Sequence, residues 1–415
     1  MAFKRNRSLW LWAIFLSLLA LRIYSNALAN LSPYNTYTAL IINGFVYGAI
    51  VIPLVVGIYL LIMHGTRWHL LLAAFLAALL VVCQFKILKA NYIVLAFALS
   101  FYSPEEITLM YRRSLGLTFV LAYVSGLFVH NTRSFIDGVY SFGFYNENQT
   151  GFVITLLAIL MTVKITEKSV TLNLNRKNEA FLLLVFLIVS FYFKDRTAEL
   201  MIIAYVLLIW GRRLFKSRLF QFFVGAFPLL LAWAAYYCGM NYGIKPFLFI
   251  VNKLSTSRLL MWNYYFMHQP LTLQGNRINV IKGWGLFYTP GQGMFDGSYA
   301  YMLFVYGLIF SIVLFIGLAL ANFKLAWSGN YMLAIIMMVI EISGFTENQM
   351  VSVMISFAAI FALIAYMPKW IHRADKDVLN EILNIETEPE YFKSCLSKFN
   401  RIRACYPFKF PYSVY

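Results

Sequence analysis

Long runs of apolar residues, separated by short polar turns, recur along almost the whole chain. The runs are continuous and do not alternate with polar residues, which predicts helices rather than strands. Many approach the ~20 residues that a helix needs to cross a hydrocarbon core of roughly 30 Å. We therefore predict an all-α, polytopic membrane bundle of about twelve transmembrane helices, with spans near residues 9–28, 38–63, 69–86, 91–103, 114–130, 149–165, 179–194, 198–211, 219–240, 299–322, 331–346 and 350–368.

The composition also indicates a membrane protein. Hydrophobic residues make up 61% of the 415 positions and charged residues 12%. A chain of this composition lacks the polar residues that the surface of a soluble domain needs. We expect residues 1–368 to form a single transmembrane domain and residues 369–415 to form a basic tail.

The basic residues gather in short clusters between the apolar runs. If the first cluster is cytoplasmic, alternate crossings return every later cluster to the same side, as the positive-inside rule requires. Both termini and the tail are therefore predicted to be cytoplasmic. The net charge of +17 is divided among these clusters, which argues against a nucleic-acid-binding surface. The clusters are Lys4, Arg5 and Arg7; Arg67; Arg112 and Arg113; Lys164, Lys168, Arg176 and Lys177; and Arg212, Arg213, Lys216 and Arg218.

Two connections on the predicted outer face are long. Residues 131–149 form the first, and residues 241–298, between spans 9 and 10, form the longer one. Long connections with little regular structure inside a compact fold are more often functional than structural. We expect the chemistry to depend on polar residues in these outer loops.

Two arginines stand at the mouths of spans on this face, Arg196 in FKDRTAEL and Arg258 in STSRLLMW. A guanidinium group presents a fork of donors that matches phosphate oxygens two at a time, so two converging arginines could clamp a diphosphate. In the alternative interpretation, Arg196 pairs with Asp195 or Glu199 and Arg258 extends to lipid headgroups. The residues alone leave both interpretations open.

Carboxylates and amides near the same face are further candidates. Asp296 precedes a span and Glu347 lies in a tight turn between two spans, so either could act as a general base on a sugar hydroxyl. Asp296 could equally cap a helix. Asn146 and Asn148, in SFGFYNENQTGF, carry amides suited to sugar hydroxyls, although Asn148 could instead cap the next span.

The sequence predicts no metal or cofactor site. Its five histidines have no metal-ligand spacing, and its four cysteines have no paired spacing. It also has no Walker loop and no Gly-x-Ser-x-Gly elbow. We therefore do not expect an ATP-driven, serine-hydrolase or metal-dependent reaction.

In their order along the chain, these motifs resemble those of the membrane polymerases of bacterial surface polysaccharides. That superfamily includes O-antigen, capsule and exopolysaccharide polymerases and the O-antigen ligases. The resemblance covers residues 141–348, and the rest of the chain is similar only in hydropathy. Glu147, Asp195 and Gly297 replace the residues that are usual in the family. The motifs are Gly143, Phe144, Asn146 and Asn148; Asp195, Arg196, Thr197 and Ala198; Ser257, Arg258 and Trp262; and Asp296, Gly297, Ser298 and Tyr299, followed by Tyr306 and Gly307.

The resemblance implies a glycosyltransferase that joins oligosaccharide repeat units carried on undecaprenyl diphosphate. The donor and acceptor would meet on the outer face of the bacterial cytoplasmic membrane, and no nucleotide, metal or other cofactor would be needed. Arg196 and Arg258 would stabilise the diphosphate leaving group, and Lys282 and Tyr299 would contact the substrate. The expected partners are membrane lipid, a flippase and a chain-length regulator.

Two other functions stay open. An O-antigen ligase shares this scaffold, but ligases of the family resemble one another in a His-Asn pair where this chain has Asp296, Gly297 and Ser298. A flippase for lipid-linked sugars also has about a dozen spans, but it needs polar residues deep within its helices. Here the main ones are Arg22 and Glu341, both near predicted span ends, so a polymerase is the preferred hypothesis.

Overall fold

The first unit of the chain, Met1–Arg373, contains all the helices and strands described below, and residues 374–415 form a second unit. The second unit lies outside the described residues. The structure is a computed structural model, and it describes residues 2–23, 36–84, 87–128, 135–136, 139–140, 144, 147–166, 169–173, 175–276, 295–368 and 370–371.

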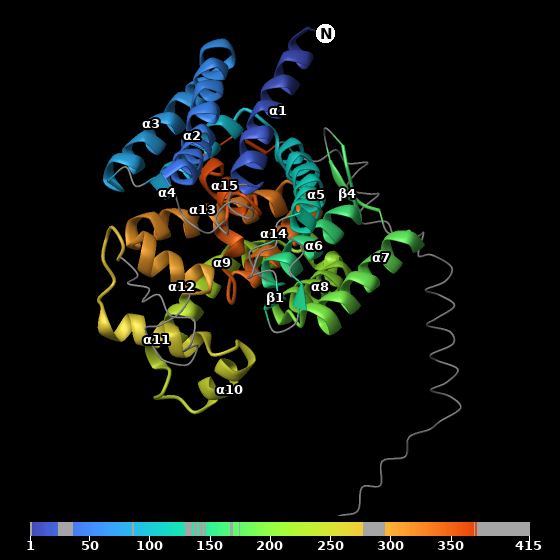
Figure 1. The fold of residues 1–415 in the computed structure, drawn as a ribbon, viewed down its shortest axis with the longest axis vertical. Coiled ribbons are helices and arrows are strands. Elements are labelled where there is room, and N and C mark those ends of the chain that lie inside the picture. The colour runs from blue at the N-terminus through green and yellow to red at the C-terminus, as the bar shows by residue number, and fades with distance from the viewer. Residues whose placement is uncertain are drawn as a thin grey trace, which may run out of the picture. The chain divides into compact units, whose positions relative to one another are not determined.

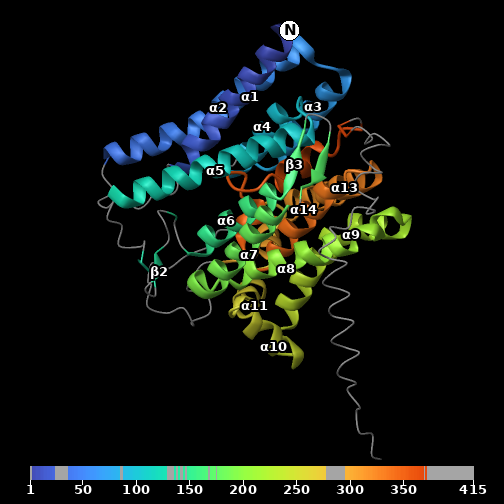
Figure 2. The ribbon, with the colours of Figure 1, turned by 90° about the vertical axis from the view of Figure 1, so that its right-hand side faces the viewer.

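Helices build nearly all of the described part of the first unit, which confirms the helical prediction (Figure 1). The first five helices pack on one another, and Figure 2 shows α1, α2 and α5 running side by side. Through α4 and α5 this group joins α15 and α6. The five are α1 (Ala2–Ile23), α2 (Thr36–His64), α3 (Arg67–Val82), α4 (Ile87–Leu99) and α5 (Pro104–Phe128).

Among the remaining helices, α14 is buried over almost its entire length because it is apolar on nearly all sides. Helices α8, α9, α13 and α15 all contact α14. These helices are α6 (Glu147–Met161), α7 (Arg176–Leu187), α8 (Arg196–Trp210), α9 (Arg218–Asn241), α13 (Leu308–Trp327), α14 (Tyr331–Ser343) and α15 (Ala358–Ile364).

Short elements connect these helices. Two antiparallel hairpins pair β1 (Phe135–Ile136) with β2 (Val139–Tyr140), and β3 (Val163–Ile165) with β4 (Val170–Leu172). A π-helical segment, Ile188–Phe193, follows α7, and another, Met302–Tyr306, lies between α12 (Ser298–Tyr301) and α13. Two 3-10 segments are Gly211–Lys216 and Asn348–Val351.

Three helical segments are long and apolar enough to cross a membrane, judged by length and composition within the described residues. They are Tyr47–His64 of α2, all of α9 and all of α13. Several other apolar helices are shorter, among them α3, α6 and α14. The described part of the chain is thus compatible with a membrane protein, and the count of twelve spans stays a prediction.

The structure differs from the predicted spans in several places. The predicted span at 149–165 ends in strand β3, and the one at 299–322 is interrupted at Gly307, between a π-helical segment and α13. Helix α5 begins at Pro104, ten residues before the predicted span, because Ser103 and Glu106 form a capping box ahead of the apolar run. The run at 350–368 is not one helix, since only Ala358–Ile364 is α-helical. The irregular backbone before it is tolerated because residues such as Val351 and Val353 are buried in protein.

The long connection at 241–298, expected to have little regular structure, contains two helices. These are α10 (Phe247–Leu254) and α11 (Arg258–His268). Both views place them at the end of the first unit away from the start of α1 (Figures 1 and 2). Helix α11 packs on α9, so this connection is held against the bundle.

Candidate functional site

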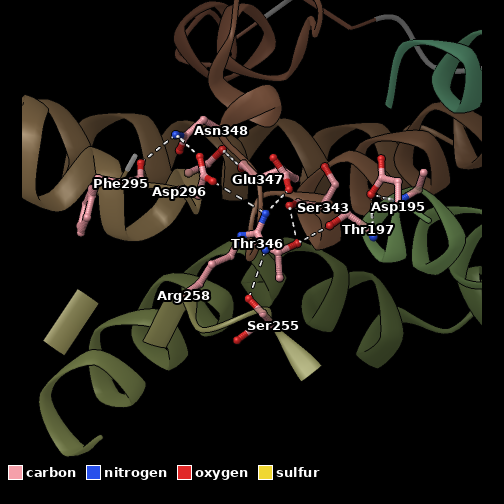
Figure 3. Close-up of polar contacts among 12 residues, drawn as sticks. Asp195, Thr197, Ser255, Arg258, Phe295, Asp296, Ser343, Thr346, Glu347 and Asn348 are labelled. Atoms are coloured by element: carbon pink, nitrogen blue, oxygen red, sulfur yellow. Dashed lines mark hydrogen bonds and ion pairs between the residues drawn. The ribbon is translucent and has the colours of Figure 1, made fainter. Parts of the chain in front are cut away.

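Arg258, the first residue of α11, lies at the centre of a buried polar cluster (Figure 3). Its Nη2 donates a hydrogen bond to Oε1 of Glu347 and lies 3.8 Å from Oδ2 of Asp296. Its Nη1 donates to the carbonyl oxygen of Ser255 at 3.2 Å. The side chains of Arg258 and Glu347 are 9% and 5% exposed, whereas that of Asp296 is 27% exposed. Asp296 is therefore the member of this trio that a ligand reaches most easily.

The spacing of Arg258 and Trp262 explains why both contact Asp296. Residues four apart share one face of a helix. Nε1 of Trp262 donates to the carbonyl oxygen of Asp296 at 2.6 Å, while Arg258 faces the carboxylate of the same residue. One face of α11 thus fixes both the backbone and the side chain of Asp296.

Gly297 allows the chain to turn sharply between Asp296 and α12. Its φ of +96° is unfavourable for residues with a side chain, and a Cβ there would lie 2.6 Å from Cζ2 of Trp262. After this turn, the backbone N and Oγ of Ser298 donate to the carbonyl oxygen of Glu347 at 3.1 and 2.6 Å. Gly297 therefore lets Ser298, at the start of α12, form hydrogen bonds with Glu347, in the turn after α14.

Asn348 strengthens this connection. Its Nδ2 donates to the carbonyl oxygen of Phe295 at 2.8 Å and to Oδ1 of Asp296 at 3.2 Å. Asp296 therefore has one carboxylate oxygen on Asn348 and the other beside Arg258. Asp296 and Glu347, separate candidates in the sequence, lie together at Arg258 in the structure.

Asp195 caps the N-terminus of α8. Its Oδ1 accepts hydrogen bonds from the backbone N of Thr197 at 3.0 Å and of Ala198 at 3.2 Å. Its Oδ2 is buried and has no hydrogen-bond partner among the described residues. That oxygen faces Gly151 of α6, where a Cβ would lie only 2.5 Å away. Gly151 thus allows α6 to pack closely against Asp195.

A threonine pair connects this cap to the turn that holds Glu347. Oγ1 of Thr197 lies 2.8 Å from Oγ1 of Thr346, within hydrogen-bond distance. Figure 3 shows Asp195 and Thr197 to one side of the group formed by Arg258 and Glu347. Helices α6, α8 and α11 and the turn after α14 therefore meet in one region.

The backbone around the cluster is unusual. Lys194, Thr256 and Ser257 have φ values of 53°, 53° and 64°, in the left-handed region that non-glycine residues rarely adopt. Lys194 immediately precedes Asp195, and Thr256 and Ser257 are the two residues before Arg258. The two π-helical segments also flank Asp195 and Ser298. Strained residues and π-helical turns concentrate at functional sites, which favours a functional interpretation of this region.

The electrostatics of the cluster allow proton exchange near neutral pH. Burial raises the pKa of Glu347 to about 8, against the opposing effect of Arg258, and Asp296 and Asp195 raise it further. Burial also raises the pKa of Asp195 to about 6, although two backbone donors and Arg258 oppose the shift. Glu347 could therefore take up or release a proton in the pH range where a general base operates.

Arg196 lies outside the buried cluster. Its side chain is exposed, and its Nη1 donates to the carbonyl oxygen of Lys253 at 3.2 Å. Arg258 binds the carbonyl of Ser255, so both arginines hold the turn between α10 and α11. Within the described part of the chain Arg196 forms no ion pair with Asp195 or Glu199. Both guanidinium groups thus bind the turn between α10 and α11, but that of Arg196 is exposed and that of Arg258 is buried.

The other predicted site residues have varied positions. Asn148 is partly exposed in the first turn of α6, inside the helix rather than at its cap. Tyr299 is fully buried and packs against Phe315, so a substrate does not reach its side chain in this conformation. Asn146 and Lys282 lie outside the described residues. The described residues contain no group of His, Cys, Asp and Glu that could hold a metal ion.

Lys89 is a buried cation that sequence analysis did not select. Its Nζ donates to the carbonyl oxygens of Tyr306 at 2.6 Å and Gln274 at 3.1 Å. Lys89, in α4, therefore links the segment after α11 to the end of the second π-helical segment, next to Gly307. The available signal was a lysine within an apolar run that begins at Ile87.

Comparisons of the chain with protein-family models, with curated proteins and with solved structures found no match. Arguments about function therefore depend on the cluster itself. The cluster joins three polar segments that are far apart in the sequence, those of Asp195, Asp296 and Glu347, around one guanidinium group.

Proposed function

We propose that this protein is a membrane glycosyltransferase that joins polysaccharide repeat units carried on undecaprenyl diphosphate. The observation that carries the proposal is the convergence of Asp296 and Glu347 on Arg258, beside the Asp195 cap. Three of the motifs that resemble bacterial polysaccharide polymerases supply residues to this region. The apolar helices support a membrane location, and the proposal assigns it to the bacterial cytoplasmic membrane with the cluster on the outer face.

In this proposal Arg196 makes the first contact with the lipid-linked donor. Its side chain is exposed, and only one of its donors is used among the described residues, on the carbonyl of Lys253. A guanidinium fork in that position suits a diphosphate oxygen pair. Arg258 lies deeper and would stabilise the negative charge that develops on the leaving diphosphate.

The transfer itself needs a proton acceptor. The bond between the anomeric carbon of the donor and its phosphate oxygen breaks, and the acceptor hydroxyl oxygen bonds to that carbon. The hydroxyl proton passes to a carboxylate, and undecaprenyl diphosphate leaves with the electron pair. Glu347 suits this role through its pKa of about 8, and Asp296 suits it through its exposure. The energy comes from the diphosphate linkage, so no nucleotide is required.

The test uses full-length protein in liposomes with undecaprenyl diphosphate-linked repeat units, with EDTA and without nucleotides. We expect wild-type protein to form a ladder of longer glycans. Arg196→Ala and Asp296→Asn should reduce elongation by at least tenfold. Arg213→Ala, which removes another exposed arginine, is the matched control and should behave as wild type. Normal ladders in both site variants would reject the proposed site.

A specific observation keeps transport as a second candidate. Glu341 of α14 is fully buried, and both its carboxylate oxygens accept from Nδ2 of Asn322 of α13, at 3.0 and 2.8 Å. Buried polar pairs of this kind line substrate paths in transporters. A strain lacking the gene separates the candidates: a polymerase defect leaves single repeats on the outer leaflet, and a flippase defect leaves them on the inner leaflet.

The same strain separates polymerase from ligase. Loss of a ligase leaves long glycans on undecaprenyl diphosphate that are not passed to their final acceptor. Loss of a polymerase leaves only single repeats. We expect single repeats, because Asp296, Gly297 and Ser298 stand where ligases of the family have a His-Asn pair.

A further inference from the structure

Helix α10 exposes an apolar stripe, and Phe249, off that stripe, is also 53% exposed. Phe247, Ile250 and Leu254 are 53%, 67% and 66% exposed, and their spacing places them on one face of the helix. Leu248 and Asn252, on the other face, are buried. A contiguous apolar face is rarely left in water, so something covers it in the working protein.

Asn252 fixes the direction in which this stripe faces. Its Nδ2 donates to the hydroxyl of Tyr242 at 3.2 Å, and its Oδ1 accepts from the backbone N of Leu260 at 3.0 Å. These bonds tie α10 to the end of α9 and to α11. The helix therefore cannot turn its apolar stripe inward without breaking these hydrogen bonds, which are partly buried.

The position of α10 in the chain keeps it near a membrane surface. Helix α9, one of the segments long enough to cross a membrane, ends at Asn241, and α10 begins at Phe247. A connection of this length reaches at most about 20 Å, at roughly 3.5 Å per residue. Trp233 and Tyr236, near the same end of α9, are 63% and 41% exposed, as is common at a membrane boundary.

The charges beside the stripe suit lipid headgroups. Lys245 precedes α10 and Lys253 lies in its last turn, and both are exposed. Ile244, 67% exposed, extends the apolar surface toward α9. An exposed apolar stripe with flanking lysines is the pattern of a helix that lies in the headgroup region of a bilayer.

We propose that α10 lies in the membrane–water interface, with Phe247, Ile250 and Leu254 among the lipid chains and Lys245 and Lys253 at the phosphates. The partner of this surface is the lipid bilayer. The inference rests on the membrane location that the proposed function includes, and it does not depend on glycosyl transfer.

This contact would place the arginines relative to the membrane. The turn that follows α10 supplies the carbonyl of Lys253 to Arg196 and the carbonyl of Ser255 to Arg258. Insertion of α10 would therefore hold Arg196 at the height of the lipid phosphates. A lipid-linked diphosphate could then reach it by lateral diffusion in the outer leaflet.

The test measures the surroundings of individual nitroxide labels in full-length protein reconstituted in nanodiscs that contain anionic lipid. Labels at cysteines introduced by Phe247→Cys, Ile250→Cys and Leu254→Cys are compared with Lys245→Cys and Lys253→Cys. The background replaces Cys83, Cys238, Cys395 and Cys405 by serine or alanine. Relaxation by oxygen, which concentrates in lipid, is compared with relaxation by a water-soluble nickel chelate.

We expect oxygen to relax the three stripe labels at least twofold more effectively than nickel does, and the two lysine positions to show the reverse. Dominant nickel relaxation at Ile250→Cys would place the stripe in water and overturn the proposal. Low relaxation by both reagents would mean that protein covers the stripe, which also overturns it. Either result leaves the elongation assay unaffected, so this inference and the proposed function fail separately.

A second measurement avoids the cysteine-free background. A photo-crosslinking amino acid at position 250 of the otherwise native chain is irradiated in nanodiscs, and the adducts are identified by mass spectrometry. Lipid adducts at position 250 support insertion, with position 248, which faces protein and is fully buried, as the control that should give few. Adducts only to protein, or none at position 250, would overturn the proposal.

Discussion

Arg258 and Glu347, 89 residues apart in the chain, form a buried ion pair at the centre of the candidate site. The charge of each side chain is the main interaction that offsets the free-energy cost of burying the charge of the other. Removing one partner leaves an uncompensated buried charge, whereas replacing both by apolar residues of similar size can be neutral. The pair therefore links the stability of this region to its proposed chemistry, and substitutions can separate the two.

Above about pH 8, where Glu347 is ionised, we expect Arg258→Met to lower the free energy of unfolding by about 3 kcal/mol or more, because the Glu347 carboxylate is left buried without its cation. The double variant with Arg258→Met and Glu347→Leu should recover most of that loss. Elongation should be absent in both. Thermal unfolding in detergent, combined with the liposome assay, measures the two effects. Elongation by the double variant would show that the pair serves only the fold.

The pKa of Glu347 predicts how elongation depends on pH. As a general base it must be unprotonated, so elongation should rise with pH and level off above about 8. Glu347→Gln should be inactive at every pH. Initial elongation rates between pH 6 and 9 provide the measurement. A rate independent of pH over that range would exclude Glu347 as the base.

The same pKa predicts a trend in stability. The folded protein binds this proton more tightly than the unfolded chain does, since the pKa of Glu347 is raised on folding. Stability should therefore fall as pH rises from the ordinary glutamate value, near 4.5, to about 8, and then level off. Melting temperatures of wild type should decline more steeply over this range than those of Glu347→Gln. Parallel curves would contradict the raised pKa.

Gly297 should tolerate alanine poorly. Its φ of +96° and the 2.6 Å approach to Cζ2 of Trp262 mean that a methyl group adds both backbone strain and overlap. Gly297→Ala should cost about 2–4 kcal/mol of stability and disturb Asp296. Gly243→Ala is the matched control, because φ is +86° there but the space around it is open, so only about 1–2 kcal/mol is expected. Equal losses in unfolding measurements would contradict the overlap.

Lys89 should matter for stability although it lies outside the cluster. Lys89→Met removes the donor for the carbonyls of Tyr306 and Gln274 and should cost about 1–3 kcal/mol. The exposed Lys253 offers a control, since Lys253→Met should change stability by less than about 0.5 kcal/mol. Thermal unfolding of both variants tests this. Equal melting temperatures would mean that water replaces the lost donor.

The sequence predicted the helices better than their ends. Apolar runs locate most helices because burial or lipid requires apolar surface along the whole element. The predicted start of α5, near residue 114, was wrong, although Ser103, Pro104 and Glu106 are the residues of a helix-capping motif. The break before α15 carries no such signal, since its residues are as apolar as a helix. Only burial by neighbouring helices allows irregular backbone there.

The candidate site was predicted in parts. Arg258, Asp296 and Glu347 were selected separately, because charged residues at the ends of apolar runs stand out in the sequence. Thr346 and Lys89 could not be selected from the sequence, since a single hydroxyl or lysine has no distinctive spacing. Their importance lies in partners that are distant along the chain.

By itself, the sequence determined that the chain is apolar and rich in helix, and which few charged residues are available for chemistry. Hydrophobic periodicity and composition can be assessed locally, without knowledge of the tertiary structure. The tertiary structure decided which of those charges meet. It buried Arg258 with Glu347 and left Arg196 exposed, and it oriented the apolar stripe of α10 outward. Pairing and burial depend on how helices far apart in sequence pack, and no local pattern encodes that packing.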